Sequence, residues 1–360
     1  MAKIKVGIVG CGGIANQKHL PALSRNDGVE VVAFCDIVVE RAQKAAKEYG
    51  TPDAKVYTDY KELLKDKSID NVHVLTPNRS HSFITVDALQ AGKNVMCEKP
   101  MAINSVEAKK MLDAAKKTGK ILTIGYQNRY RQDSAYLKEA CENGDLGEIY
   151  YARAHAIRRR GVPTWGVFTN EYEQGGGPLI DIGTHALDLT LWCMDNYKPK
   201  MVVGNVYKKL GKQTRTGNTF GDWKTEDFTV EDSAFGYITM QNGASIYLES
   251  AWALNSLDVD EAKTSLCGTK AGADMRDGLR INGVKYNKQY IETPFFKAGG
   301  VAFFKGGGSI DAPDVELKTF LDACTKGKEL IVKPEQAFVV TQLLEAIYES
   351  AKTGKPVYFD

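Results

Sequence analysis

The chain has 360 residues, of which 43% are hydrophobic and 26% charged, and its formal net charge is +2. At roughly 150 residues per domain, this length predicts two domains, and the composition excludes a mainly disordered protein. The sequence has no long basic run to indicate a nucleic-acid partner and no apolar stretch of about 18 residues to indicate a membrane span. Seven cysteines without a C-x-x-C spacing predict reduced thiols in the cytoplasm, with neither disulfides nor a metal site.

The first third of the sequence alternates short apolar strands with amphipathic helices. Repetition of strand and helix is typical of a parallel sheet covered by helices on both faces. We therefore expect a doubly wound α/β domain over residues 1–125. Its strands are predicted at 3–9, 30–35, 71–75, 94–97 and 121–125, and its helices at 40–49, 60–65, 83–91 and 106–118.

The pattern changes after residue 125, where longer strand-like runs are joined by short polar turns. This predicts an α+β domain over 126–360, built on an open and mostly antiparallel sheet. Two stretches without periodicity, 211–226 and 282–309, are predicted as long loops, which are often functional. The strands are expected at 148–158, 200–208, 233–240, 244–252 and 261–267, and the helices at 134–142, 179–193, 315–324 and 335–351.

A glycine-rich turn lies where the first strand should lead into the first helix. Its G-x-G-x-x-A pattern consists of Gly10, Gly12 and Ala15, with Gly13 and Ile14 inside the turn. The first glycine permits the turn, the second lets a pyrophosphate approach the backbone, and the alanine allows close packing of helix on strand. The pattern predicts a dinucleotide site at a helix N-terminus, as in a Rossmann domain; a tight turn without a ligand is the alternative.

An acidic residue ends the second predicted strand. Asp36 lies 21 residues beyond Ala15, where a carboxylate can accept hydrogen bonds from the adenosine ribose and repel a 2′-phosphate. NAD is therefore the expected cofactor, although Arg41 in the next helix leaves NADP open. Asp36 can also serve as a cap for the helix that follows.

Polar residues follow two further strands of the predicted parallel sheet. Thr76, Pro77, Asn78 and His81 come after one strand, and Glu98-Lys99-Pro100 comes after the next. Open parallel sheets bind ligands at the carboxyl ends of their strands. A partly desolvated lysine at that edge can take or give a proton, and the proline can fix the backbone so that Lys99 points inward.

The segment 175–188 contains the strongest signal of the second domain. In a helix from residue 179, Asp181, His185 and Asp188 occupy positions i, i+4 and i+7 and share one face. An imidazole one turn from a carboxylate is a proton-transfer pair. The alternative is a capped helix with a purely structural histidine–aspartate contact.

Four motifs together resemble the Gfo/Idh/MocA oxidoreductases: the glycine-rich turn, Glu98-Lys99-Pro100, Asp181-x-Gly183-x-His185, and the closing segment 346–357. The resemblance spans nearly the whole chain. It implies a Rossmann domain, followed by an α+β domain whose sheet commonly mediates dimers or tetramers. It also implies that Lys99, Asp181 and His185 form the catalytic group. The residues that it places around the cofactor are Thr76, Pro77, Asn78, His81, Glu98, Lys99 and Gln127.

Within that family, the run 158–168 is similar to sugar and glycoside dehydrogenases, including those that act at C3 of glucosides. Trp165 offers an apolar face to a sugar ring, and Arg158 offers a donor fork. We therefore expect the substrate to contact Tyr126, Arg158 and Trp165 as well as the catalytic residues. His155, which alternates with its neighbours on a strand, is interpreted as structural.

These features predict an NAD-dependent dehydrogenase that oxidises a secondary ring hydroxyl of a sugar, cyclitol or glycoside, as a homo-oligomer. His185, aided by Asp181, removes the hydroxyl proton and Lys99 stabilises the oxygen, with the formal base left open between Lys99 and His185. This hypothesis requires both side chains to reach one alcohol oxygen. The alternatives are a redox-neutral enzyme that retains NAD and acts through a keto-sugar, and a non-catalytic NAD-responsive regulatory protein.

Overall fold

The computed structural model describes residues 3–296 and 312–359. Contacts within the chain define two compact units. The first comprises Met1–Gln127 and Ile310–Thr341, and the second comprises Asn128–Ser309 and Gln342–Asp360. A stretch from near the end of the sequence therefore completes the first unit. The domain limits expected from the sequence, 1–125 and 126–360, stay a prediction.

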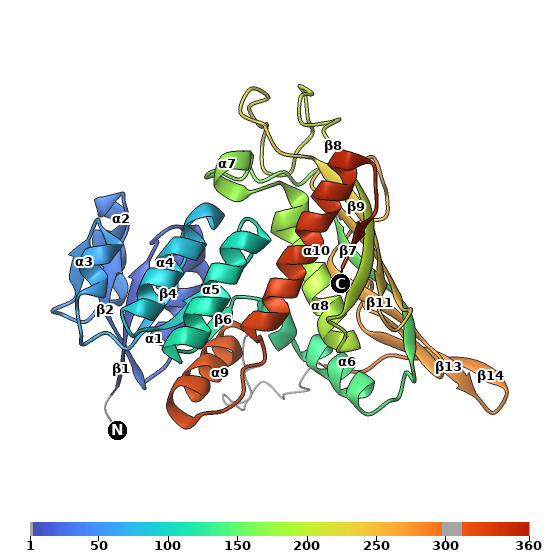
Figure 1. Ribbon diagram of the computed structural model, residues 1–360, viewed down its shortest axis with the longest axis horizontal. Helices are drawn as coiled ribbons and strands as arrows, with labels where there is room; N and C mark the ends of the chain where they lie inside the picture. Colours follow the sequence, from blue (N-terminus) through green and yellow to red (C-terminus); the bar gives the residue numbers. More distant parts are fainter. Residues whose placement is uncertain (1–2, 297–311, 360) are drawn as a thin grey trace, which may run out of the picture. The chain divides into compact units, whose positions relative to one another are not determined.

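The first unit is built on a six-stranded sheet in the order β3-β2-β1-β4-β5-β6, in which all pairs are parallel (Figure 1). This order reverses at β1, as it does in dinucleotide-binding sheets. The doubly wound domain predicted from the sequence is confirmed. The strands are β1 (Ile4–Val9), β2 (Val29–Cys35), β3 (Lys55–Tyr57), β4 (Asn71–Val74), β5 (Asn94–Cys97) and β6 (Leu122–Ile124).

Helices pack on this sheet and bury its apolar side chains. Leu317 and Leu321, from a helix late in the sequence, join the same core cluster as Val6, Ile8 and Leu20. The helices are η1 (Ala15–His19, a π-helix), α1 (Leu20–Ser24), α2 (Val39–Tyr49), α3 (Tyr60–Leu64), α4 (Asn78–Gln90), α5 (Ser105–Thr118), η2 (Gln127–Tyr130, a 3₁₀ turn that runs into the second unit) and α9 (Ala312–Lys326). Strand β3 was not predicted, because its three residues are largely exposed and carry no apolar run.

The second unit contains a nine-stranded sheet in the order β14-β13-β12-β11-β7-β10-β9-β8-β15. Its one parallel pair among the named strands is β7 with β10, so the expected mostly antiparallel sheet is confirmed. The strands are β7 (Ile149–Ile157), β8 (Pro199–Tyr207), β9 (Ser233–Met240), β10 (Ser245–Ala251), β11 (Asp260–Gly268), β12 (Ala271–Asp274), β13 (Arg280–Lys285), β14 (Lys288–Glu292) and β15 (Val357–Tyr358).

One face of this sheet is covered by helices. Helix α8 packs on β7 and β11. A Cβ at Gly204 or Gly236 would lie within 2.7 Å of Ile347, so α10 lies close against β8 and β9. The helices of the unit are α6 (Gln132–Glu142), α7 (Glu171–Gln174), η3 (Leu179–Gly183, a π-helix that continues directly into α8), α8 (Thr184–Met194) and the second half of α10 (Pro334–Thr353).

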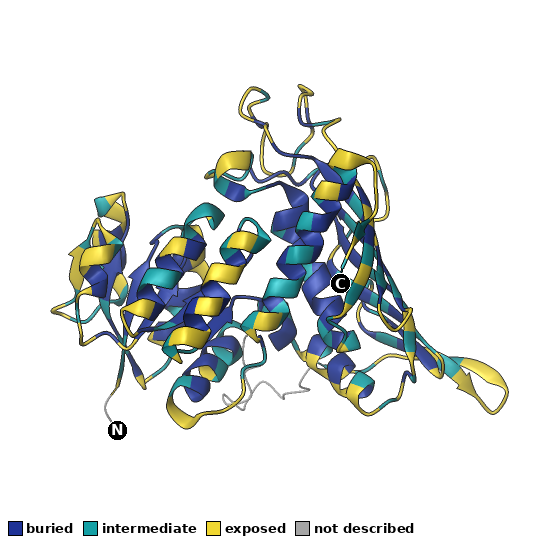
Figure 2. Ribbon diagram, viewed as in Figure 1, coloured by how far each residue is buried: buried dark blue, intermediate teal, exposed yellow. Residues whose placement is uncertain are grey.

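The prediction of a loop over 282–309 is wrong for its first part. Strands β13 and β14 form a hairpin there, and Figure 2 shows it mostly exposed. Two polar strands with few buried residues lack the alternation that identifies a half-buried strand. Residues 297–309 lie outside the described residues. The stretch 211–226 contains neither helix nor strand, as predicted.

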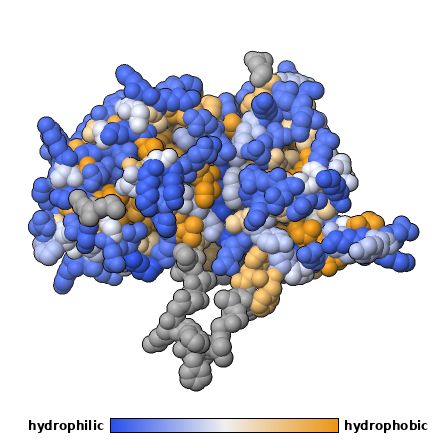
Figure 3. Space-filling view, turned by 90° about the horizontal axis from the view of Figure 1, so that it is seen from below, coloured by the Kyte–Doolittle hydropathy of each residue, from blue (hydrophilic) through white to orange (hydrophobic). Residues whose placement is uncertain are grey.

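Hydrophilic side chains cover most of the face shown in Figure 3, where hydrophobic residues form separate small patches. Among the residues that the structure describes, no helix has the length and apolar character needed to cross a bilayer.

Candidate functional site

The glycine-rich turn has the geometry that a pyrophosphate requires. Gly10 has φ of 95°, and a Cβ there would lie 2.6 Å from the carbonyl oxygen of Leu75, so only glycine fits. At Gly12, by contrast, a Cβ would meet no atom within 4 Å. Packing within the chain therefore does not require a glycine at position 12.

The helix that follows the turn begins without a side-chain cap. Ile14 occupies the N-cap of η1, and the first turn contains no acidic residue. Ile14 and Gly13 are exposed, while Ala15 is buried against the core. The N–H groups and positive dipole end of the helix thus suit an anion.

Asp36 at the end of β2 connects the turn to the next loop. Its carboxylate accepts hydrogen bonds from Cys11 N at 2.8 Å and from Val38 N at 2.8 Å. Asp36 is 8% exposed, and each carboxylate oxygen retains a lone pair for a further donor such as a ribose hydroxyl. The predicted role of Asp36 as the helix cap is wrong, because the N-cap of α2 is Val38 and no side chain caps it. Asp36 instead bonds Val38 N in the loop before the helix. Arg41 lies exposed on α2.

The loops after β4 and β5 are joined by a buried histidine. His81 Nδ1 lies 2.8 Å from the carbonyl oxygen of Pro100, and Nε2 lies 2.8 Å from that of Thr76. Burial lowers the pKa of His81, so the neutral ring donates to one of these oxygens. His81 thereby lies between the loop after β4 and the loop that carries Lys99, in contact with a backbone oxygen of each. Thr76 and Asn78 are half-buried, and Pro77 is exposed.

Glu98 belongs to a buried group of charges that we call the Lys18 cluster: Lys18, His19, His73, Glu98 and Glu316. Lys18 Nζ lies 2.7 Å from Glu98 Oε1 and 2.9 Å from Glu316 Oε2. His19 Nε2 lies 2.8 Å from Glu98 Oε1, and its Nδ1 lies 3.1 Å from His73 Nδ1. Glu98 Oε2 accepts the backbone N–H of Lys99 at 3.1 Å. The cluster therefore fixes the Glu98 side chain, which in turn binds the backbone of Lys99.

The Lys18 cluster shifts the pKa values of its members. Burial alone would raise the pKa of Glu98, but Lys18 and His19 hold it well below its usual range. Burial lowers the pKa of His19, and that of His73 even further. For Glu316 burial prevails over the attraction of Lys18 and raises the pKa to about 7. The ionised pair is Lys18 and Glu98, with Glu316 partly protonated near neutral pH.

In the second unit, the segment of η3 and α8 carries Asp181 and His185. Trp252 Nε1 donates a hydrogen bond to Asp181 Oδ2 at 3.0 Å, and the Trp252 side chain is fully buried. Ser250 Oγ donates to the carbonyl oxygen of Pro178 at 2.8 Å. Both contacts come from the end of β10 and its continuation, so the sheet fixes the first turn of this segment. Asp181 and His185 are both half-buried.

The beginning of η3 is capped by a buried glutamate. Glu231 accepts hydrogen bonds from Gly177 N at 2.9 Å, from Leu179 N at 3.1 Å and from the Tyr348 hydroxyl at 2.8 Å. Burial raises the pKa of Glu231 despite these donors. A Cβ at Gly176 would lie 2.0 Å from the Tyr348 oxygen, and one at Gly177 would lie 2.4 Å from the carbonyl oxygen of Glu231. Tyr348 and the backbone of Glu231 therefore lie too close to positions 176 and 177 for any residue with a Cβ.

Asp188 has a structural partner of its own. Arg129 binds it in bidentate fashion, with Nη2 2.6 Å from Oδ1 and Nε 2.9 Å from Oδ2. Both side chains are nearly inaccessible to solvent. Burial raises the pKa of Asp188, and Arg129 opposes that shift. Asp188, expected on one polar face with Asp181 and His185, therefore serves the core of the unit.

Arg158 and Trp165 lie in the second unit with Asp181. Arg158 forms two 2.6 Å contacts with Glu261. Burial would lower the pKa of Arg158, but Glu261 and the charge of Asp181 raise it. Trp165 is 53% exposed. Of the other predicted residues, Lys99, Tyr126 and Gln127 belong to the first unit; Tyr126 is fully buried, and Lys99 and Gln127 are half-buried.

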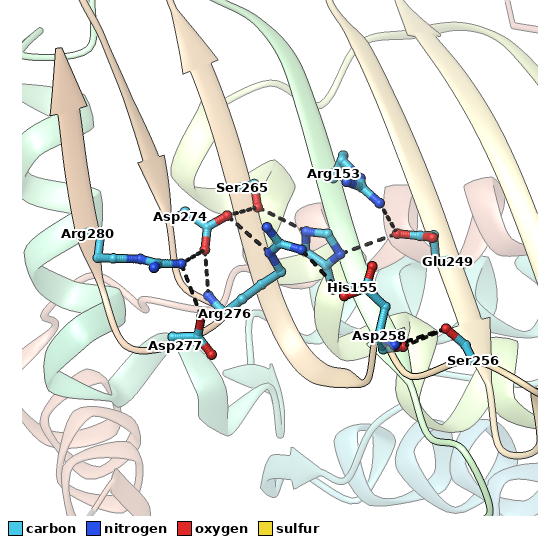
Figure 4. Close-up of polar contacts among 10 residues, drawn as sticks. All are labelled: Arg153, His155, Glu249, Ser256, Asp258, Ser265, Asp274, Arg276, Asp277 and Arg280. Carbon is cyan, nitrogen blue, oxygen red and sulfur yellow. Dashed lines mark hydrogen bonds and ion pairs between the residues drawn. The ribbon is translucent and has the colours of Figure 1, made fainter. Parts of the chain in front are cut away.

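A second polar group lies on the face of the nine-stranded sheet opposite α8 and α10, and Figure 4 shows its contacts. We call it the Asp274 cluster: Arg153, His155, Glu249, Ser265, Asp274, Arg276 and Arg280. His155 Nε2 lies 2.9 Å from Ser265 Oγ, and Nδ1 lies 3.3 Å from Glu249 Oε2. Both ring nitrogens thus have partners, as the structural interpretation of His155 requires. A cavity of about 100 Å³ lies beside the cluster.

Sequence reasoning missed Lys18, His19, Glu231 and Trp252. Each acts through a partner that is distant in the sequence, such as Glu98 for Lys18 and Asp181 for Trp252. The one usable signal was Lys18-His19 itself, a charged pair on a helix that must pack against a buried sheet. No local pattern indicates Glu231.

The chain matches the Gfo/Idh/MocA oxidoreductase family in both halves. Residues 4–126 match its NAD-binding Rossmann fold, and residues 138–359 match its C-terminal alpha/beta domain. The chain is similar to D-glucoside 3-dehydrogenase of Escherichia coli K12, with 37% identity over 354 residues that cover 98% of this chain and 97% of that protein.

Two further relatives are more distant. Inositol 2-dehydrogenase of Salmonella typhimurium is 35% identical over 198 residues, which cover 54% of this chain and 56% of that protein. The fold resembles that of levoglucosan dehydrogenase in complex with NADH and L-sorbose, with a TM-score of 0.84 at 21% identity over the full length of both chains. With its glycine-rich turn, parallel sheet and second α/β domain, the chain belongs to the Gfo/Idh/MocA family of NAD-binding oxidoreductases.

Proposed function

We propose that the protein oxidises the C3 hydroxyl of a D-glucoside with NAD, giving a 3-keto glycoside and NADH. The observation that carries this proposal is the similarity over nearly the whole chain to D-glucoside 3-dehydrogenase of Escherichia coli. The open space at Gly12, the uncapped helix N-terminus and the carboxylate of Asp36 suit a dinucleotide without a 2′-phosphate.

The catalytic group in this proposal is Lys99, Asp181 and His185. His185 takes the hydroxyl proton, and Asp181 stabilises the resulting positive charge from one helical turn away. Lys99 donates a hydrogen bond to the oxygen as it gains negative charge. NAD, when bound, supplies the hydride acceptor. Trp252 restrains Asp181, while Glu98 and His81 restrain the backbone around Lys99.

The remaining predicted contacts are part of the same proposal. Gly10, Gly12, Gly13, Ile14 and Ala15 hold the pyrophosphate, and Arg158 and Trp165 contact the substrate. The predicted substrate contact of Tyr126 is not kept, because its side chain is fully buried. Asp36 binds the adenosine ribose. The other cofactor contacts are Arg41, Thr76, Pro77, Asn78, His81, Glu98, Lys99 and Gln127.

A substrate panel tests the proposal. Methyl and phenyl glucosides, free hexoses and inositols are incubated with NAD or NADP, and products are assigned by NMR while absorbance at 340 nm is followed. We expect NADH to accumulate with glucosides and NAD, and oxidation at C3. A keto product without NADH accumulation would instead indicate the redox-neutral enzyme. Binding of NAD without turnover of any compound would indicate the regulatory protein.

Two variants test the catalytic group. Lys99→Met and His185→Ala should each lower kcat by about 10²-fold or more, because each removes a group that interacts with the reacting oxygen. Lys110→Met, on the exposed surface of α5, is the matched control and should leave kcat unchanged. Near-normal turnover by both site variants contradicts the assignment. For a base, kcat falls at low pH as the base becomes protonated. If this fall is absent in His185→Ala but present in wild type and in Lys99→Met, His185 is the base.

We further propose that the protein is a cytoplasmic homo-oligomer that associates through the β8–β9 part of the uncovered face of the nine-stranded sheet, away from the Asp274 cluster. Val203 pairs with Tyr237, and both are exposed, whereas their neighbours Gly204 and Gly236 face Ile347 of α10. All seven cysteines are free thiols, which suits a reducing compartment. Light scattering should give the mass of a dimer or tetramer, and Tyr237→Asp should shift it toward that of a monomer; a monomeric wild type refutes the proposal.

A further inference from the structure

A row of aromatic side chains leads from Asp181 to the surface of the second unit. Trp252, which binds Asp181, lies 6.4 Å from Phe168 between ring centroids, and Phe168 lies 5.9 Å from Trp165. Trp165 lies 5.0 Å from Phe220 at an interplanar angle of 86°. Trp252 is 0% exposed at the inner end of the row, whereas Trp165 and Phe220 at the outer end are 53% and 44% exposed. The row therefore ends in two exposed rings in edge-to-face contact.

Phe220 is held in place by the backbone around it, although the loop 211–226 contains no helix or strand. The Thr164 hydroxyl donates to the carbonyl oxygen of Phe220 at 2.6 Å. The Asn218 side chain accepts from Val162 N at 2.8 Å and donates to the carbonyl oxygens of Val162 and Gly221. These hydrogen bonds fix the backbone around Phe220, so its exposed ring is held in one defined position.

The loop is also anchored at its base. Trp223 is buried, donates to the carbonyl oxygen of Gly211 at 2.9 Å and packs on Phe228. The Thr219 hydroxyl donates to the carbonyl oxygen of Arg160 at 2.8 Å. The loop thus has its own small core, and the cost of ordering it is met by contacts other than those of Phe220.

We propose that Trp165 and Phe220 form a subsite for an aryl aglycone of the glycoside. This inference rests on the proposed function, because it places the oxidised sugar next to Asp181 and the aglycone farther along the aromatic row. Flat apolar rings bind best to aromatic edges and faces. The polar side chains beside the pair, Thr164, Asn218 and Thr219, already bind the backbone of the loop and of residues 160–162. An aglycone rich in hydroxyls finds few partners there.

The test compares substrates that share the glucose and differ in the aglycone. Initial rates of keto-glycoside formation are measured for methyl glucoside, phenyl glucoside and a glucosyl disaccharide, in both anomeric series, with the full-length protein. Wild type should give a higher kcat/KM with phenyl than with methyl glucoside. Phe220→Ala should reduce the phenyl-to-methyl ratio of kcat/KM about tenfold, mainly through KM, while kcat for methyl glucoside stays near wild type. Trp165→Ala should reduce the same ratio about tenfold, and it can also slow methyl glucoside because Trp165 is a proposed substrate contact.

Two controls separate ring loss from disturbance of the loop. Phe220→Tyr keeps the ring and should keep the ratio, even if Phe220→Ala disorders the loop. Tyr286→Ala removes a fully exposed aromatic side chain from the β13–β14 hairpin and should leave the ratio unchanged.

The outcomes distinguish this inference from the proposed function. An unchanged phenyl-to-methyl ratio in both alanine variants, with glucosides still oxidised, overturns the subsite alone. An equal loss with the disaccharide and the phenyl glucoside shows a sugar subsite and overturns the aryl assignment. If the wild type oxidises no glycoside or free sugar, the proposed function fails, and the inference fails with it.

Discussion

The two polar clusters use the same kinds of side chain in different surroundings. In the Lys18 cluster, Lys18, Glu98 and Glu316 have side-chain exposures of 7%, 7% and 2%. In the Asp274 cluster, Arg276 and Arg280 are 32% and 33% exposed, and Asp274 is 21% exposed. Water can therefore replace a missing partner in the second cluster but not in the first.

The charge balance of the clusters differs as well. In the contacts that the structure describes, Lys18 is the sole cation paired with Glu98 and Glu316. His19 and His73 are neutral, because burial lowers the pKa of each. Asp274, in contrast, has two arginines and Ser265 around it, and its pKa is lowered to about 2. Removing the one cation of a buried cluster should therefore cost much stability. Removing one of several cations from a partly exposed cluster should cost little.

The largest effect is expected from Lys18→Met, which leaves two buried carboxyl groups without a cation. We expect the free energy of unfolding, measured in urea, to fall by about 3–5 kcal/mol. The control is Lys109→Met, which removes an exposed lysine paired with Asp113 on α5 and should change stability very little. A loss below about 1 kcal/mol for Lys18→Met would show that the buried carboxyls protonate at little cost.

A smaller effect is expected from the titration of Glu316. Because its folded pKa of about 7 exceeds the ordinary value of 4.5, its contribution is complete below pH 4.5 and is lost as the pH rises toward 7. The lowered pKa values of His19 and His73 act in the opposite direction below pH 6.5, so the wild-type curve alone is ambiguous.

The difference in the free energy of unfolding between Glu316→Gln and wild type isolates the contribution of the Glu316 carboxyl group. That difference should be constant below pH 4.5 and should move in favour of the variant by up to about 3 kcal/mol between pH 4.5 and 7. Urea unfolding at several pH values measures it. If the difference does not change with pH, the pKa of Glu316 is the same in the folded and unfolded states, and Glu316 is ionised at pH 7.

The smallest effect is expected in the Asp274 cluster. Arg276→Gln should cost at most about 1 kcal/mol, because Arg280 and water remain near Asp274. The cost should fall further in 1 M salt, whereas that of Lys18→Met should not. If Arg276→Gln proves as costly as Lys18→Met, exposure does not explain the difference between the clusters.

Local sequence patterns predicted the elements that repeat or alternate. Gly10, Gly12 and Ala15 identified the turn between β1 and η1, because that motif requires small residues at fixed spacing within one strand–turn–helix unit. Every strand of the first unit except β3 was expected near its observed place. The helical spacing of Asp181 and His185 likewise needs no information from outside the segment.

The features that sequence reasoning missed depend on distant parts of the chain. Asp188 is paired with Arg129, and the helix N-terminus near Leu179 is capped by Glu231; neither partner stands out in its own segment. The β13–β14 hairpin was missed because its strands are polar on both faces, so no alternation reveals them. Periodicity reports which face a residue occupies, not which residue it meets there.

The placement of α9 in the nucleotide-binding unit has a consequence for biosynthesis. Leu317 and Leu321 complete the core beside Leu20, and Glu316 Oε2 lies 2.9 Å from Lys18 Nζ. A ribosome must therefore have translated the chain through α9 before the strands of the first unit can reach their final packing. Until then, the first unit carries an apolar surface that Leu317 and Leu321 have yet to cover, which is a species that chaperones recognise.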